Sequence, residues 1–189
     1  MTHRLIYVVG PSGAGKDSVL HRLRGAWSGT PPAHWARRTI TRAAQAGGEP
    51  NECVERSQFE RLQREGAFAM HWHANGHAYG IRRPELAPLA SGHCVFVNGS
   101  RAHLPQLLGQ WPEATVVQIT APAEVLLERL QTRNRESVQA ISDRLARSIE
   151  TELPASAIRI VNDGPISDAV DMLQAALRQR LGERASCER

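Results

Sequence analysis

Short apolar runs alternate with amphipathic segments along most of the chain. The runs at residues 4–9, 93–97, 115–120 and 158–161 have the length and the β-branched content of buried strands. Each is followed by a segment with apolar residues at helical spacing, and these segments lie at 17–26, 100–108, 124–131 and 166–181. Strands that alternate with helices favour a parallel sheet covered on both faces. We therefore predict an α/β fold, a three-layer sandwich with a central parallel sheet.

Residues 41–80 interrupt this alternation because they are more polar. A capping box that begins at Ser57 predicts a short helix, and Asn75-Gly76 is a strong hairpin signal between two strands. The further elements are expected at 36–40, 57–65, 68–74, 77–81 and 84–92. We predict one domain over residues 1–189, in which residues 41–80 form an inserted lobe.

A glycine-rich loop joins the first predicted strand to the first predicted helix. Residues 10–17 read GPSGAGKD, which matches the phosphate-loop pattern G-x-x-x-x-G-K up to its last position. The glycines let successive backbone N–H groups face a phosphate, and the lysine reaches the β- and γ-phosphates. We predict that this loop binds ATP. Its expected ATP-binding residues are Gly10, Pro11, Ser12, Gly13, Ala14, Gly15, Lys16, Asp17 and Ser18.

The basic residues strengthen this interpretation. Lys16 is the single lysine among 23 lysines and arginines, in a chain of 189 residues. A G+C-rich genome explains a preference for arginine but not the position of the one lysine. A planar guanidinium is a poor substitute for an ammonium in a narrow phosphate loop. The composition also excludes the N-K-x-D box of GTP switches and a Schiff-base lysine elsewhere.

Charge, hydropathy and cysteine spacing limit the classes of partner and the cellular compartment that we expect for this protein. The net charge is +4, but the arginines are spread along the chain with acidic residues among them, so no nucleic-acid partner is expected. No run approaches the roughly 20 apolar residues of a membrane span. The three cysteines have no C-x-x-C spacing, which favours a reducing, cytoplasmic compartment. The sequence leaves the oligomeric state open, a homo-oligomer included.

The position that follows Lys16 departs from the phosphate-loop pattern. The usual serine or threonine, whose hydroxyl holds Mg²⁺, is Asp17 here, and Ser18 follows it. The strand at 93–97 runs into Asn98, where phosphate-loop enzymes often place a metal-orienting aspartate. We interpret Asp17 as the relocated carboxylate of a Mg²⁺ site. The alternative is that Asp17 only caps the helix start, where an anion is favoured.

Several separate segments together resemble the guanylate-kinase-like kinases, over about residues 4–181. Within that group, the sequence is similar to the ribose 1,5-bisphosphate phosphokinases of phosphonate breakdown. The segments that carry the resemblance are Gly10–Ser18, Arg38–Glu49, Trp72–Gly80, Asn98–Gln106, Arg133–Glu136 and Asn162-Asp163-Gly164. The resemblance implies transfer of the γ-phosphoryl group of ATP, with Mg²⁺, to ribose 1,5-bisphosphate, which gives 5-phosphoribosyl 1-diphosphate.

Two departures from guanylate kinase favour a sugar phosphate over GMP. The glutamate that reads the guanine edge in that relative corresponds to Met70, which cannot accept a hydrogen bond from a base N–H. The second arginine of its phosphate grip corresponds to Gln45. The base-reading residues are therefore missing. The alternatives are guanylate kinase or another small nucleotide or sugar-phosphate kinase, and, from another class, a non-catalytic guanylate-kinase-like interaction module.

The resemblance also implies roles for residues outside the loop. Arg133 and Arg135, in a lid at residues 131–138, would act with Lys16 on the transferred phosphoryl group. Asn162 and Asp163 would line the adenine pocket. The expected acceptor residues are Arg38, Arg42, His73, Tyr79, Asn98, Arg101 and His103. The residues whose roles the sequence leaves open are His71, His77, Arg129, Arg144 and Arg147.

Overall fold

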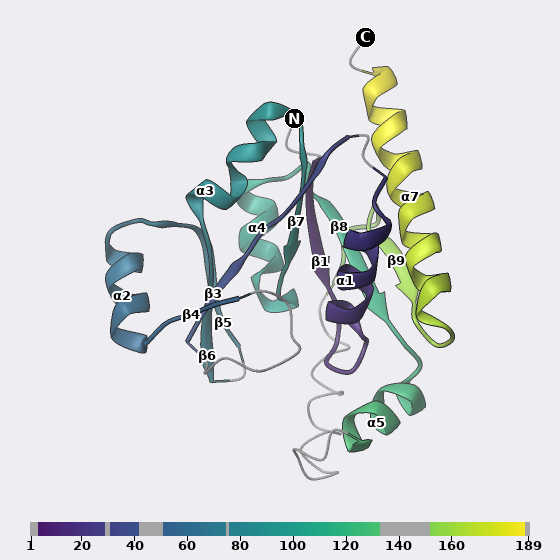
Figure 1. The fold of residues 1–189 in the computed structure, drawn as a ribbon, viewed down its shortest axis with the longest axis horizontal. Helices are drawn as coiled ribbons and strands as arrows, with labels where there is room; N and C mark the ends of the chain where they lie inside the picture. Colours follow the sequence, from purple (N-terminus) through teal and green to yellow (C-terminus); the bar gives the residue numbers. More distant parts are fainter. Residues whose placement is uncertain (1–3, 29–30, 42–50, 75, 133–151, 188–189) are drawn as a thin grey trace. The chain divides into compact units, whose positions relative to one another are not determined.

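The computed structural model describes residues 4–28, 31–41, 51–74, 76–132 and 152–187, with the backbone alone for 183–187 (Figure 1). The chain forms two compact units. Met1–Tyr7 and Ser28–Thr115 make up the first, and Val8–Trp27 and Val116–Arg189 the second. The expected lid at 131–138 falls mainly outside the described residues, and so does a further helix that the sequence predicts from the lid to about residue 153.

Most strands of the structure follow the predicted pattern. They are β1 (Leu5–Val9), β2 (Ala33–Trp35), β3 (Arg38–Ile40), β4 (Asn51–Cys53), β5 (Phe68–Ala74), β6 (His77–Arg82), β7 (Cys94–Asn98), β8 (Thr115–Thr120) and β9 (Ile158–Val161). Five of them form a central sheet in the order β2-β7-β1-β8-β9. The β2–β7 and β8–β9 pairs are parallel. The α/β fold with a central parallel sheet is therefore confirmed.

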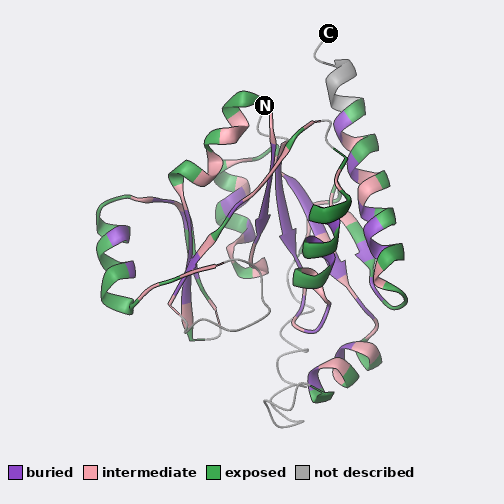
Figure 2. Cartoon of the chain, viewed as in Figure 1, coloured by how far each residue is buried: buried purple, intermediate pink, exposed green. Residues whose placement is uncertain are grey.

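The helices cover apolar surface of these strands. They are α1 (Lys16–Ala26), α2 (Arg56–Arg64), α3 (Arg83–Leu86), α4 (Leu104–Gln110), α5 (Ala123–Thr132) and α7 (Ile166–Cys187), with 3₁₀ turns η2 (Ala87–Ser91) and η3 (Arg101–His103). In the second unit α1 and α7 pack together, and the Gln174 side chain donates to the carbonyl of Ala26 at 3.2 Å. Figure 2 shows buried residues along one side of α7 and exposed residues along the other. None of the described helices is long and apolar enough to cross a membrane.

The first unit carries a second sheet, in the order β4-β3-β6-β5. It includes β3, so it extends beyond the expected lobe at residues 41–80. Strands β5 and β6 form the predicted antiparallel hairpin, in which Trp72 pairs with Tyr79 and His73 with Ala78. Phe59 of α2 packs with Phe68 of β5 and with Ala78, so α2 covers the face that carries Ala78. Trp72 and Tyr79 lie on the opposite face.

Several local details differ from the sequence prediction. Helix α2 forms, but its N-cap is Glu55 and no side chain caps it, so Ser57 lies inside the first turn and the predicted capping box is wrong. The helix predicted over 100–108 is a 3₁₀ turn followed by α4, with a proline in the first turn of α4. The strands β2 and β4 were not predicted, because three-residue strands are too short to show hydrophobic periodicity.

Gly99 is fixed by the ring of Tyr7 and provides a test of the first unit. A Cβ at Gly99 would lie 2.0 Å from Tyr7 Cζ, and the Tyr7 side chain is fully buried. We expect Gly99→Ala to lower the free energy of unfolding by about 1–3 kcal/mol through overpacking, measured by urea denaturation. The control is Gly109→Ala in α4, where a Cβ meets nothing within 4 Å, and it should stabilise the protein by roughly 0.5–1 kcal/mol. Equal effects of the two substitutions would contradict this packing.

Candidate active site

The glycine-rich loop closes around the lysine that the sequence singles out. Lys16 Nζ donates to the carbonyl oxygens of Gly10, at 3.0 Å, and Pro11, at 3.3 Å. Gly15 is the N-cap of α1 and has a φ of 79°, a conformation that other residues rarely adopt. No side chain caps this end of α1. The first-turn N–H groups and the ammonium thus form the positively polarised setting that a polyphosphate requires.

The loop packs tightly against its surroundings in the second unit. A Cβ at Gly10 would lie 1.9 Å from the carbonyl oxygen of Ile119, in β8. A Cβ at Gly15 would lie 2.6 Å from the side-chain nitrogen of Asn162. Both contacts involve atoms in or beside the central strands, which cannot move freely. The glycines are therefore required by space as well as by backbone conformation.

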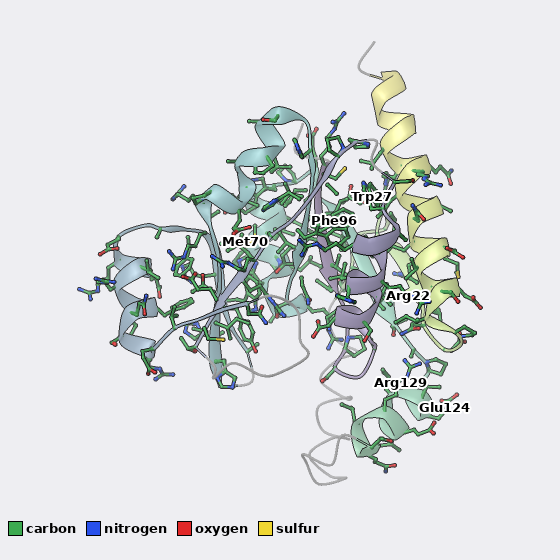
Figure 3. All side chains as sticks on the ribbon, in the orientation of Figure 1. Arg22, Trp27, Met70, Phe96, Glu124 and Arg129 are labelled. Carbon is green, nitrogen blue, oxygen red and sulfur yellow. The ribbon has the colours of Figure 1, made fainter. Side chains whose placement is uncertain are left out.

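The buried side chain of Asn162 fixes the backbone of the loop. Its side-chain nitrogen donates to the carbonyl oxygen of Ala14 at 2.9 Å, and the residue is only 4% exposed. The backbone N–H of Asn162 donates to the carbonyl of Thr120 at 2.7 Å, and its carbonyl accepts from Arg129 Nη1 at 2.9 Å. Figure 3 shows Arg129 on α5. These bonds fix Asn162 between two strands, the loop and α5, whereas Asp163 is exposed.

The start of α1 fits a bound Mg²⁺. Asp17 and Ser18 are both exposed in its first turn, and both offer the oxygen ligands that Mg²⁺ prefers. Among the residues that the structure describes, no group of three or more His, Cys, Asp or Glu side chains could hold a metal ion. Mg²⁺ commonly keeps several waters and uses one or two protein oxygens together with substrate phosphates. The residues present fit that mode of binding.

A second cluster of polar and aromatic side chains forms around Tyr7 in the first unit. The Tyr7 hydroxyl accepts a hydrogen bond from the backbone N–H of Ser100 at 3.0 Å. The same oxygen lies 3.2 Å from His103 Nδ1 and 3.3 Å from the carbonyl oxygen of Ser100. Burial raises the pKa of Tyr7 well above its ordinary value. The hydroxyl therefore stays protonated and holds the turn that follows β7.

Trp72 joins this cluster to the strand β6. Its ring is edge-on to Tyr7, with centroids 6.5 Å apart, and 5.4 Å from the ring of His103. Trp72 also stacks in parallel beside Tyr79, at 5.8 Å, and the guanidinium of Arg38 lies 5.8 Å from the centroid of Tyr79. A continuous row of side chains thus runs from Arg38 to Tyr7.

The structure brings several of the predicted acceptor residues together. Arg38 and Tyr79 are in contact, and His103 belongs to the same row through Trp72. Arg101 lies in the same turn as His103, and partial burial lowers the pKa of its guanidinium. Asn98 is buried at the end of β7.

Other predicted residues lie elsewhere. His73 is exposed on the face of the sheet that also carries Ala78, opposite to the Trp72–Tyr79 pair, so the structure does not bring it to this cluster. His77 pairs with Ala74, and its Nδ1 lies 3.1 Å from the carbonyl oxygen of Thr41. The predicted residues that fall outside the described part of the chain are Arg42, Arg133, Arg135, Arg144 and Arg147.

Sequence reasoning did not assign a role to Tyr7 or to Trp72. Tyr7 is a single aromatic residue in the apolar run that forms β1, and Trp72 alternates with two histidines in β5. A phenol in a strand that is buried along its whole length was the available signal, because a buried hydroxyl requires a partner. Which partner it finds depends on the turn after β7, which no local pattern specifies.

The fold and the loop define the chain as a P-loop protein of the guanylate-kinase-like class. A guanylate kinase from Anaplasma phagocytophilum has the same fold, with a TM-score of 0.69 at 20% identity over 93% of this chain and 84% of that one. The chain belongs to the ribose 1,5-bisphosphate phosphokinase PhnN family. It is 43% identical to the member from Pseudomonas paraeruginosa over 187 residues, covering 98% of this chain and 99% of that protein.

Other members of the family are longer. The chain is 44% identical over 178 residues to a ribose 1,5-bisphosphate phosphokinase PhnN from Janthinobacterium sp. strain Marseille. That match covers 93% of this chain but 39% of the relative. No protein-family model matches the chain. The family assignment therefore comes from relatives that match this chain over nearly their whole length, such as the protein from Pseudomonas paraeruginosa.

The amide of Asn162 provides a test of how the loop is held. Asn162→Ala would leave the Ala14 carbonyl without its buried donor, and we expect the free energy of unfolding to fall by about 1–3 kcal/mol. We also expect weaker binding of a non-hydrolysable ATP analogue, measured by calorimetric titration. Gln174→Ala is the matched control, because it removes an exposed amide-to-carbonyl bond, and its effect should stay within about 0.5 kcal/mol. Unchanged analogue affinity in Asn162→Ala would contradict the role of this bond.

Proposed function

We propose that this protein is an ATP-dependent kinase that phosphorylates ribose 1,5-bisphosphate and releases 5-phosphoribosyl 1-diphosphate. The observation that carries the proposal is the phosphate loop closed around Lys16, the single lysine, in a chain of this family. Relatives along the full length of the chain are named as ribose 1,5-bisphosphate phosphokinases. We place the reaction in phosphonate breakdown in the cytoplasm.

The proposed reaction forms one bond and breaks one bond at phosphorus. An oxygen of the acceptor's 1-phosphate attacks the γ-phosphorus of ATP, and the bond between that phosphorus and the β,γ-bridging oxygen breaks to release ADP. The attacking oxygen is already anionic, so no strong general base is required. Catalysis then depends on alignment and on stabilisation of charge on the transferred group.

The donor side of the reaction uses the second unit. Backbone N–H groups of the loop would bind the phosphates, and Lys16 would exchange its bonds to Gly10 and Pro11 for the β- and γ-phosphate oxygens. Arg133 and Arg135 would help to neutralise the negative charge of the transferred phosphoryl group. Asp17 and Ser18 would hold Mg²⁺, which supplies neutralisation of the phosphate charge when bound.

The acceptor side uses residues of the first unit. Arg38, Arg101 and His103 would bind the phosphates of the sugar, together with Arg42, which lies four positions after Arg38. Met70 is only 3% exposed on the strand β5, shown in Figure 3, and its thioether is a poor partner for a base N–H. A bisphosphorylated sugar without a base suits this set of side chains.

Replacing the single lysine tests the donor side. We expect Lys16→Met to lower kcat about a thousand-fold, because a preorganised charge on the transferred phosphoryl group is lost, and Lys16→Arg to recover little of it. Release of ADP in a coupled assay provides the rate. Arg22→Met is the matched control, since it removes an exposed cation from the same helix, α1, and its rate should equal that of the parent protein. Undiminished phosphorylation by Lys16→Met would refute the proposal.

An acceptor panel tests the substrate. With ATP and Mg²⁺ we expect turnover of ribose 1,5-bisphosphate and little turnover of GMP, because Met70 stands in place of the guanine-reading carboxylate of guanylate kinase. The product is identified as 5-phosphoribosyl 1-diphosphate by phosphorus NMR. Efficient phosphorylation of GMP with none of the sugar would identify a guanylate kinase instead. Failure of the protein to bind ATP would indicate a non-catalytic interaction module.

A further inference from the structure

The geometry around Tyr7 assigns it a role in the acceptor site. We propose that Tyr7 is a positioning residue whose hydroxyl donates a hydrogen bond to Nδ1 of His103. The imidazole then carries its own proton on Nε2, and it presents this N–H to a phosphate oxygen of the acceptor. The inference rests on the proposed function, because it requires an anionic acceptor.

The hydrogen-bond inventory of the hydroxyl limits the arrangements to two. The oxygen already accepts from the Ser100 N–H, and its one proton can go to His103 Nδ1 or to the Ser100 carbonyl. In the first arrangement His103 has its proton on Nε2. In the second, Nδ1 is protonated and donates to Tyr7, and Nε2 has only a lone pair.

One observation and one requirement of the proposed function favour the first arrangement. The Ser100 carbonyl already accepts from the backbone N–H of His103 at 3.2 Å, which lowers its need for a second donor. An anionic acceptor requires an N–H from His103, and a lone pair on Nε2 would repel it. The Tyr7 ring has little freedom to alter this choice, because it is fully buried between the backbone of Gly99 and the ring of Trp72.

The electrostatic setting keeps both groups in the required protonation states. Burial, with a smaller contribution from His71, lowers the pKa of His103, so the imidazole is neutral at neutral pH. A neutral imidazole has a single N–H, so its location decides whether the residue can donate to a phosphate. The titratable and charged groups around it are Tyr7 from β1, His71 from β5, Arg38 from β3 and Arg101 from η3.

The first test reads the tautomer directly. Long-range ¹H–¹⁵N NMR of the full chain, without substrate, distinguishes a proton on Nε2 from one on Nδ1, and His103→Gln identifies the signals of His103. We expect the Nε2–H form in the parent protein and a mixture of the two forms in Tyr7→Phe, which retains the ring but lacks the proton. A parent protein with the proton on Nδ1 would overturn the proposal. This measurement does not depend on the activity.

The second test is a kinetic cycle. We expect Tyr7→Phe to raise KM for ribose 1,5-bisphosphate about tenfold, equivalent to about 1.4 kcal/mol, with KM for ATP unchanged. In the His103→Ala background the same change should have no further effect on KM, because Tyr7 acts through His103. His21→Ala, which removes an exposed histidine of α1, is the control and should match the parent protein. An additive effect of the two substitutions would mean that Tyr7 has only a structural role.

The pH dependence separates the tautomer from general packing. Below the pKa of His103 both ring nitrogens are protonated, so Nε2–H is present whether or not Tyr7 directs it. The KM ratio of Tyr7→Phe to parent should therefore approach one as the pH falls through that pKa, while ionisation of the substrate cancels in the ratio. A ratio that stays constant with pH would contradict the proposal. If the parent protein phosphorylates no sugar, the proposed function fails, and the NMR result still decides the tautomer.

Discussion

The phosphate loop imposes the strictest physical requirement on this chain. Its N–H groups must face a ligand, so its carbonyl oxygens must be held by something else. The Asn162 amide fulfils this second role at Ala14, whereas Lys16 contacts the carbonyl oxygens of Gly10 and Pro11 and would leave them for the phosphates. The space for the amide exists only because residue 15 has no Cβ. The loop sequence and the residue after β9 are thus two parts of one arrangement.

The turn after β7 follows the same logic with a hydroxyl instead of an amide. Tyr7 holds the backbone of Ser100 from inside the core, and Gly99 makes room for its ring. In both places a buried polar side chain fixes the backbone of a loop or turn. Such groups are costly to bury without partners, so each one enforces a single conformation of its loop.

The face of the second sheet that lies away from Tyr79 is stabilised by a network of charged and polar side chains. Arg82 donates to the Glu52 carboxylate at 2.6 Å, and the buried Thr39 hydroxyl donates to the same carboxylate at 2.8 Å. This network joins β3, β4 and β6, and it lies on the face away from Tyr79. The charges of Arg82 and Glu52 therefore stabilise the pairing of these strands. Arg38, their neighbour in β3, contacts the Tyr79 face instead.

The sequence by itself determined the strands other than β2 and β4, most helices, the phosphate loop and the importance of Lys16, because these depend on local periodicity and on a motif with fixed spacing. It also indicated Arg38, Tyr79 and His103, through a family resemblance. Neighbouring strand residues alternate in face, so Trp72 and His73 had to lie on opposite faces, and only the tertiary structure decided which of the two faces meets Tyr7 and His103. The partners of Tyr7 and Asn162 were likewise decided in three dimensions. Tyr7 and Ser100 are 93 positions apart, and Asn162 and Ala14 are 148 positions apart. No local sequence pattern encodes a hydrogen bond between residues so distant in the chain.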